Sequence, residues 1–180
     1  MHRWVAFLRG MNLGRRRITN DELRAAFEGM GLGSPTPFLA SGNVVFDTVE
    51  RARKRLAARI ESGLAEALGY EVPTFLRSAA EVRAVATHEP FPAERVAASR
   101  GKLQVALLPG KPSEAARQEV LAQSSPQDAL AFDGRELYWL PSGGILESPL
   151  DLAAIESRVG PWTMRTHRTM ARLAGKFLLD

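Results

Sequence analysis

The residue pattern with the clearest chemistry lies near the N-terminus, where glycines and arginines follow a short apolar run. Residues 8–19 read LRGMNLGRRRIT. Gly10 and Gly14 allow backbone conformations that expose N–H groups, because glycine adopts positive φ at little cost. Asn12 between them also tolerates left-handed geometry. The spacing therefore predicts a loop whose N–H groups are free to bind a ligand.

Arginines surround this loop and give it a positive charge. Arg9 ends the apolar run, Arg15 begins a row of three arginines, and residues 1–20 contain no acid. A helix is expected to begin after Thr19, and a helix N-terminus adds free N–H groups and a positive dipole. The combination suits a phosphate or a carboxylate. The alternative interpretation is an ordinary glycine-containing turn with solvated arginines.

A second basic segment lies near the C-terminus. Residues 158–180 contain five basic residues and one acid. Arg165, Arg168 and Arg172 are spaced so that they would share one face if the segment were helical. Guanidinium groups bind phosphates with bidentate geometry, although a solvated stripe is the other interpretation of such a face.

We predict that the two basic segments form one cleft that binds a small anionic ligand. The formal net charge is +4 and the isoelectric point is about 9.9, which favours anionic partners. Ser41 and Asn43 are sufficiently explained by a hairpin turn, and a role in ligand binding is the alternative. The predicted ligand-binding residues are Arg9, Asn12, Arg15, Ser41, Asn43, Arg165 and Thr169.

Nucleic acid is the alternative anionic partner, and exposed aromatic rings could then stack on bases. Trp4, Phe7, Phe46, Tyr138 and Trp139 all lie in strand-like segments. Apolar aromatic residues of strands more often pack against helices. We therefore expect these five rings in the core.

The sequence contains little that resembles a catalytic centre. His167 is a candidate for a general base, because the charges of Arg165 and Arg168 favour a neutral imidazole. A further alternative is therefore an enzyme that acts on a phosphorylated metabolite with His167 as its base. The three histidines do not have metal-binding spacing, and the phosphate-loop and dinucleotide-binding glycine patterns are missing. We expect no metal and no cofactor, and the sequence leaves open whether the protein is an enzyme.

The elements that must position these residues follow a repeated order. A strand over Trp4–Leu8 precedes a helix that begins with a capping box of Thr19 and Glu22. A strand pair broken at residues 41–43, a helix over residues 50–68 and a strand over residues 72–78 complete the order β-α-β-β-α-β.

The second half repeats that order. Its signals are a strand at residues 102–110, a helix from Ser113, a hairpin with its turn at Asp133-Gly134, a helix begun by Ser148-Pro149, and a last strand at residues 162–166. A terminal helix follows. The pattern predicts an α+β fold of two tandem ferredoxin-like halves with mostly antiparallel sheet. The expected parts are residues 1–78, a connecting helix and linker over 79–100, and residues 101–180.

Three stretches, read in order, resemble the signatures of a bacterial family. They are LRGMNLG followed by ITNDELR, SGNVVFDT, and TMRTHRTMARLAG, and the family is domain of unknown function (DUF) family 1697. The resemblance implies an α+β fold of two subdomains that share sheet structure, with no established activity. The chain departs from the family pattern at Pro149, where a lysine is usual, and at Thr166 and His167, where asparagine and tryptophan are usual.

The composition excludes several classes of protein. The chain has no cysteine, so disulfides and zinc–thiolate sites are excluded. No apolar run approaches the roughly 20 residues of a membrane span, and Arg9 interrupts the only apolar segment at the N-terminus. We expect a soluble cytoplasmic protein, and the sequence leaves its oligomeric state open.

Overall fold

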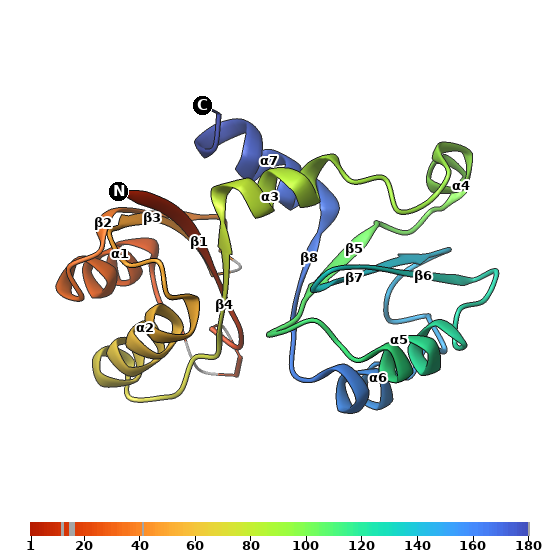
Figure 1. Ribbon diagram of the computed structural model, residues 1–180, viewed down its shortest axis with the longest axis horizontal. Helices are drawn as coiled ribbons and strands as arrows, with labels where there is room; N and C mark the ends of the chain where they lie inside the picture. The colour runs from red at the N-terminus through yellow and green to blue at the C-terminus, as the bar shows by residue number, and fades with distance from the viewer. Residues whose placement is uncertain (12, 15–16, 41, 180) are drawn as a thin grey trace. The chain divides into compact units, whose positions relative to one another are not determined.

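The fold is mixed α+β and contains two four-stranded antiparallel sheets (Figure 1). The computed structural model describes residues 1–11, 13, 14, 17–40 and 42–179. The chain packs as two compact units: Met1–Val82 with Leu173–Asp180 form the first, and Arg83–Arg172 form the second. The predicted fold class, with its repeated β-α-β-β-α-β order, is confirmed.

The first unit contains one sheet and two helices that cover it. The strands are β1 (His2–Leu8), β2 (Gly33–Phe38), β3 (Asn43–Thr48) and β4 (Thr74–Ser78), and the helices are α1 (Asn20–Gly29) and α2 (Arg53–Leu68). The strand order is β2-β3-β1-β4. In this register Val5 of β1 lies between Val45 of β3 and Arg77 of β4.

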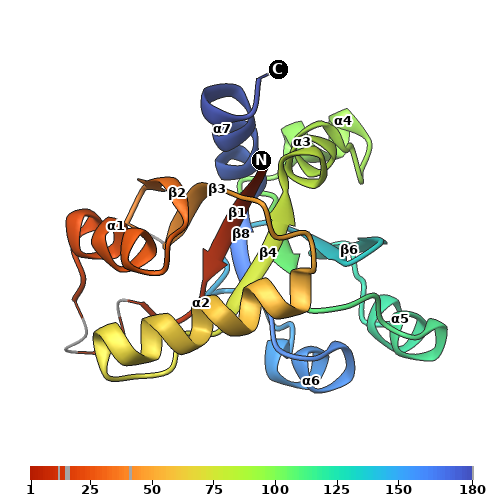
Figure 2. The same ribbon diagram turned by 60° about the vertical axis from the view of Figure 1, so that its left-hand side comes forward.

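Helices α1 and α2 pack on the same face of this sheet (Figures 1 and 2). Alternate residues of β1 reach that face, because side chains of a strand alternate between its two sides. Leu23 and Phe27 of α1 contact it at helical spacing, and Leu56, Ile60 and Leu64 do the same from α2. All five of these helix residues are buried. The period of the apolar residues thus decides which face each helix presents.

The predicted capping box of α1 is confirmed. Thr19 Oγ1 accepts a hydrogen bond from the Glu22 N–H, and the Glu22 carboxylate accepts one from the Thr19 N–H at 2.7 Å. Helix α2 begins at Arg53, three residues later than the sequence pattern predicts. The reason lies in Glu50, whose carboxylate accepts the Ala52 N–H at 2.7 Å and so holds the chain in a turn before the helix.

The second unit repeats the arrangement of the first. Its strands are β5 (Gln104–Leu107), β6 (Asp128–Asp133), β7 (Glu136–Pro141) and β8 (Thr163–Thr166), and its two covering helices are α5 (Glu114–Leu121) and α6 (Leu152–Val159). The strand order β6-β7-β5-β8 matches that of the first sheet, position for position. Ser113 caps α5 as predicted, and the β6–β7 turn contains Gly134 at positive φ.

Three further helices complete the described chain: α3 (Ala79–Thr87), α4 (Ala93–Ala98) and α7 (His167–Phe177). Both α3 and α7 begin directly after the last strand of a sheet. Helix α4 lies in the segment predicted to be a linker. None of the helices in the described residues is long and apolar enough to cross a membrane.

One prediction about the second half and one about both halves are wrong. Helix α6 begins at Leu152 with Asp151 as its N-cap, because the Asp151 carboxylate accepts the Ala154 N–H at 2.9 Å. Ser148 therefore does not cap it, and its hydroxyl donates to Asp128 instead. The sheets are also not shared between the halves, since each described strand pairs only with strands of its own half.

The Arg3–Asp47 ion pair in the first unit should make a small, pH-dependent contribution to the free energy of unfolding. The two residues face each other across β1 and β3 and form two hydrogen bonds of 2.9 Å. These bonds, opposed in part by burial, lower the pKa of Asp47 below its ordinary value. A lowered carboxyl pKa stabilises the fold above the unfolded-state value and ceases to do so as the pH falls through the folded-state value.

We expect Asp47→Asn to lower the free energy of unfolding by less than about 1 kcal/mol at neutral pH, since solvent screens such an exposed pair. The difference in the free energy of unfolding between Asp47→Asn and the parent should shrink as the pH falls through the folded-state pKa of Asp47, because its carboxyl then becomes neutral. Urea denaturation at neutral and at acidic pH measures this difference. If the free energies of unfolding of the variant and the parent differ equally at neutral and at acidic pH, the effect comes from packing and not from charge.

Candidate functional site

The first basic segment is described only in part. Arg9 directly follows β1 and is half-buried, and its backbone N–H donates to the Pro73 carbonyl at 3.0 Å. Gly10 and Gly14 have φ of +74° and +63°, which agrees with the backbone geometry predicted for this loop. Asn12, Arg15 and Ser41 lie outside the described residues, so their roles stay predictions.

The N-terminus of α1, which was expected to contribute to an anion site, already has an anion. The Glu22 carboxylate accepts hydrogen bonds from both the backbone and the hydroxyl of Thr19, and these bonds lower the pKa of Glu22. Asp21 adds a second acid to the same first turn. The protein's own acids thus satisfy the dipole of α1.

Asn43 is placed as its hairpin interpretation predicts. Its side chain is fully buried, and its Nδ2 donates to the Phe38 carbonyl at 2.9 Å. The bond joins the end of β2 to the start of β3, so that it holds the turn between them. The geometry gives Asn43 a clear structural role.

Arg165 lies in β8, so it does not share a helical face with Arg168 and Arg172. The interpretation of the three arginines as one helical stripe is therefore wrong, because α7 begins only at His167. The Arg165 side chain is buried, and its Nη1 donates to Thr163 Oγ1 and to the Met164 carbonyl, both at 2.8 Å. Burial lowers the pKa of Arg165 to about 10, so the guanidinium remains charged at neutral pH.

The first unit has a buried arginine at the same position. Arg77 lies opposite Val5 in the β1–β4 pair, as Arg165 lies opposite Val105 in the β5–β8 pair. It is 1% exposed, and its Nη1 donates to the carbonyl of the preceding residue, Leu76, at 3.0 Å. Sequence reasoning missed Arg77, although TFLRS and TMRT each place an arginine and a hydroxyl residue at the end of a strand.

The hydroxyl residue after each arginine caps the following helix. Ser78 Oγ accepts the Glu81 N–H at 3.3 Å at the start of α3. Thr166 Oγ1 accepts the Thr169 N–H at 3.2 Å at the start of α7, and the hydroxyls of Thr166 and Thr169 lie 3.0 Å apart. The two strand-to-helix junctions are therefore built alike, and Glu81 corresponds in position to Thr169.

His167 lines a cavity of about 330 Å³ in the second unit, together with His88, Phe91 and Leu103. Its Nε2 lies 2.9 Å from the Val85 carbonyl. A carbonyl only accepts hydrogen bonds, so Nε2 carries the proton, and in the neutral ring Nδ1 has the free electron pair. A general base requires such an electron pair, and a role of His167 as a base stays a prediction.

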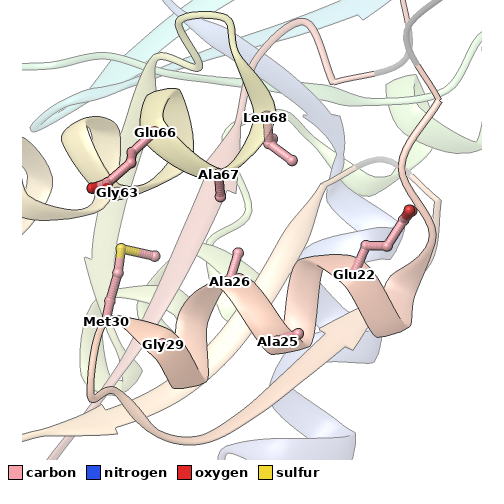
Figure 3. A pocket seen from close by; sticks show the side chains of 9 residues that line it. All are labelled: Glu22, Ala25, Ala26, Gly29, Met30, Gly63, Glu66, Ala67 and Leu68. Atoms are coloured by element: carbon pink, nitrogen blue, oxygen red, sulfur yellow. The ribbon is translucent and has the colours of Figure 1, made fainter.

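Another cavity, of about 570 Å³, lies between α1 and α2 (Figure 3). Ala26 of α1 and Met30, its C-cap, point toward α2, which contributes Gly63 and Ala67 from the facing side (Figure 3). Its two charged lining residues, Glu22 and Glu66, are acidic. The cavity is therefore unsuited to an anion.

The five aromatic residues that could have formed a base-stacking surface are all buried. Trp4 is the most exposed of them at 6%. Phe27 meets Phe46 edge to face with ring centroids 5.5 Å apart, and His88 lies against Tyr138 at 4.9 Å. The expectation of core packing is confirmed.

The sequence pattern of a known family, described as protein of unknown function (DUF1697), matches residues 1–138. The chain belongs to the DUF1697 family. This DUF1697 chain is also similar to a solved structure, the conserved bacterial protein SP0830 from Streptococcus pneumoniae, with a TM-score of 0.70 and 18% sequence identity over 97% of both chains. At that identity the likeness shows the fold alone. A comparison of the DUF1697 chain with curated proteins found no match.

Proposed function

We propose that this DUF1697 protein binds an anionic ligand, with a phosphate or carboxylate group, at the junction of β8 and α7. Arg165 supplies the main positive charge, and the first turn of α7 supplies N–H groups and hydroxyls. One observation carries the proposal: the two equivalent junctions differ in whether an acid of the protein occupies the helix N-terminus.

In the first unit an acid is present at the junction. Glu81 is the third residue of α3, and its carboxylate accepts the Ser78 N–H at 2.8 Å and two hydrogen bonds of 2.7 Å from Arg53. A carboxylate at this place satisfies the positive end of the helix dipole. The junction after β4 is therefore complete without a ligand.

In the second unit the acid is missing. The first turn of α7 contains His167, Arg168 and Thr169 and no acidic residue. A helix N-terminus next to an arginine is a favourable place for an anion, since N–H groups and charge act together. The ligand would take the place that Glu81 has in the first unit.

Arg77 and Arg165 are both buried, so the missing acid at α7, and not burial, distinguishes the two junctions. Moving a charged group out of water costs several kcal/mol, and an apolar side chain of similar size often fits such a position equally well. A guanidinium is well suited to planar, bidentate recognition of phosphate or carboxylate. The contribution of Arg9 and of its basic loop to the same ligand stays a prediction.

Substitution of the two equivalent arginines tests the proposal. We expect Arg165→Met to lose at least about tenfold in affinity for inorganic phosphate or citrate, because a hydrogen bond to a charged group is lost. The matched variant Arg77→Met should bind like the parent. Isothermal titration calorimetry measures the affinities, and thermal denaturation verifies that both variants fold.

A second substitution distinguishes loss of the anion-binding site from a general loss of stability. Thr169→Glu recreates at α7 the capping acid of α3, so it should abolish anion binding while the melting temperature stays equal or rises. The proposal is wrong if Thr169→Glu and Arg165→Met both bind these anions as the parent does. The nucleic-acid alternative differs by predicting affinity for oligonucleotides that falls steeply with salt.

A further inference from the structure

A buried carboxylate in the second unit has one oxygen that accepts no hydrogen bond from a described residue. Asp128 begins β6 and is 2% exposed. Its Oδ1 accepts a hydrogen bond from the indole Nε1 of Trp139 at 2.7 Å and one from Ser148 Oγ at 2.8 Å. Among the described residues, none donates to its Oδ2.

Asp128 lines a cavity of about 160 Å³. The other walls come mainly from the end of β7 and the chain after it, namely residues 141–144 and 147–149, with Gln127 and Arg100 beside them. The volume corresponds to about five water molecules at roughly 30 Å³ each. A small molecule, or the end of a longer one, fits such a space.

The charge of Asp128 is not explained by its structural role. Both of its side-chain donors, the Trp139 indole and the Ser148 hydroxyl, are neutral, and Asp128 forms no ion pair with the described residues. An asparagine would accept the same two hydrogen bonds without the cost of burying a charge. A carboxylate is needed at this position only if a positively charged group binds to it.

The remaining charged groups of the cavity favour a cation. Glu147 lines it as a second acid, held by a hydrogen bond of 3.3 Å from the Gly144 N–H. Arg100 is its one basic lining residue, and both Arg100 and Glu147 are exposed to solvent. The cavity is therefore lined by two acidic residues and one basic residue, and of these three only Asp128 is buried.

We propose that this cavity binds a primary ammonium group, with Asp128 Oδ2 as its charged partner. An ammonium group is compact, has three N–H donors and needs several acceptors within a small volume. The carboxylate of Asp128 offers one, and the carboxylate of Glu147, which lines the same cavity, offers another. The site lies apart from the β8–α7 junction in the residues it uses, and it takes a ligand of opposite charge.

The indole N–H of Trp139 reports directly on this site, because it donates to the same carboxylate. The chain has three tryptophans, so a ¹⁵N-labelled protein gives three indole resonances, which Trp139→Phe assigns. We expect methylammonium to shift the Trp139 resonance saturably while those of Trp4 and Trp162 stay in place. Tetramethylammonium, which has no N–H donor, should shift it at least about tenfold less effectively.

Variants of the protein test whether the charge of Asp128 is needed, and a set of amines tests which kind of ligand binds. Asp128→Asn keeps the shape and should lose at least about tenfold in affinity for methylammonium, whereas Asp133→Asn, at the exposed end of the same strand, should bind like the parent. Glycine and n-butylammonium distinguish an amino-acid amine from an alkyl amine. If Asp128→Asn does not fold, the comparison of methylammonium with tetramethylammonium on the parent protein decides.

Three results would overturn the proposal. The first is no saturable shift of the Trp139 resonance with any of these amines. The second is an equal response to methylammonium and tetramethylammonium. The third is a response to Mg²⁺ or Ca²⁺ in their place, which would make the cavity a metal site.

Discussion

Replacement of Phe27 with alanine is expected to lower the free energy of unfolding by about 3–5 kcal/mol, as for other buried phenylalanines. Phe27 has no exposed surface and is one of two buried residues of α1, the other being Leu23. Its ring lies edge to face against Phe46 of the sheet. The substitution removes that contact and leaves a cavity beneath the helix.

Urea denaturation followed by circular dichroism measures this loss. Glu28→Ala, at an exposed position of the same helix, is the matched control and should change stability by less than about 0.5 kcal/mol. A loss below about 1 kcal/mol for Phe27→Ala would mean that α1 contributes little to the core of the first unit.

Replacement of Gly101 with alanine is expected to destabilise the second unit by about 3 kcal/mol or more, the upper range for an overpacked site. A Cβ at this position would lie less than 3.0 Å from the carbonyl oxygens of Pro141 and Gly143. Both obstacles are backbone, so no side chain can rotate away. The docking of residues 99–101 on the end of β7, through Ser99 Oγ to the Pro141 carbonyl at 2.5 Å, would have to open.

Gly110→Ala provides the comparison for Gly101→Ala, because a Cβ at Gly110 meets no atom within 4 Å. Thermal denaturation should show a large decrease in melting temperature for Gly101→Ala and almost none for Gly110→Ala. Equal melting temperatures for the two variants would contradict the close packing of this segment. Since Pro141 and Gly143 also line the Asp128 cavity, Gly101→Ala should weaken methylammonium binding as well.

The fold could be predicted from the sequence because its signals are local. The capping box at Thr19, the turn at Asp133-Gly134 and the apolar periods of the helices each specify a short segment. The start of α6 was not predictable in the same way. Ser148 and Asp151 are both good N-cap residues, and what distinguishes them is the hydrogen bond from Ser148 to Asp128, twenty residues earlier in the chain.

The candidate sites depend on contacts that local pattern does not contain. The spacing of Arg165, Arg168 and Arg172 resembles a helical stripe, yet the boundary between β8 and α7 separates the first arginine from the others. Asp128 follows SSPQ and has the appearance of a solvated loop residue. Its burial results from pairing of β6 with β7, which brings Trp139 to its side chain.

Helix α7 has a consequence for how the protein is made. Its last residues belong to the first unit, where Phe177 meets Phe38 edge to face and its carbonyl accepts a hydrogen bond from Arg3. During translation the N-terminal residues emerge from the ribosome first. The contacts of Phe177 with Phe38 and Arg3 can form only after residue 177 has left the exit tunnel. The half that is synthesised earliest is therefore completed last, and a fragment cut after the second sheet would lack part of the first unit.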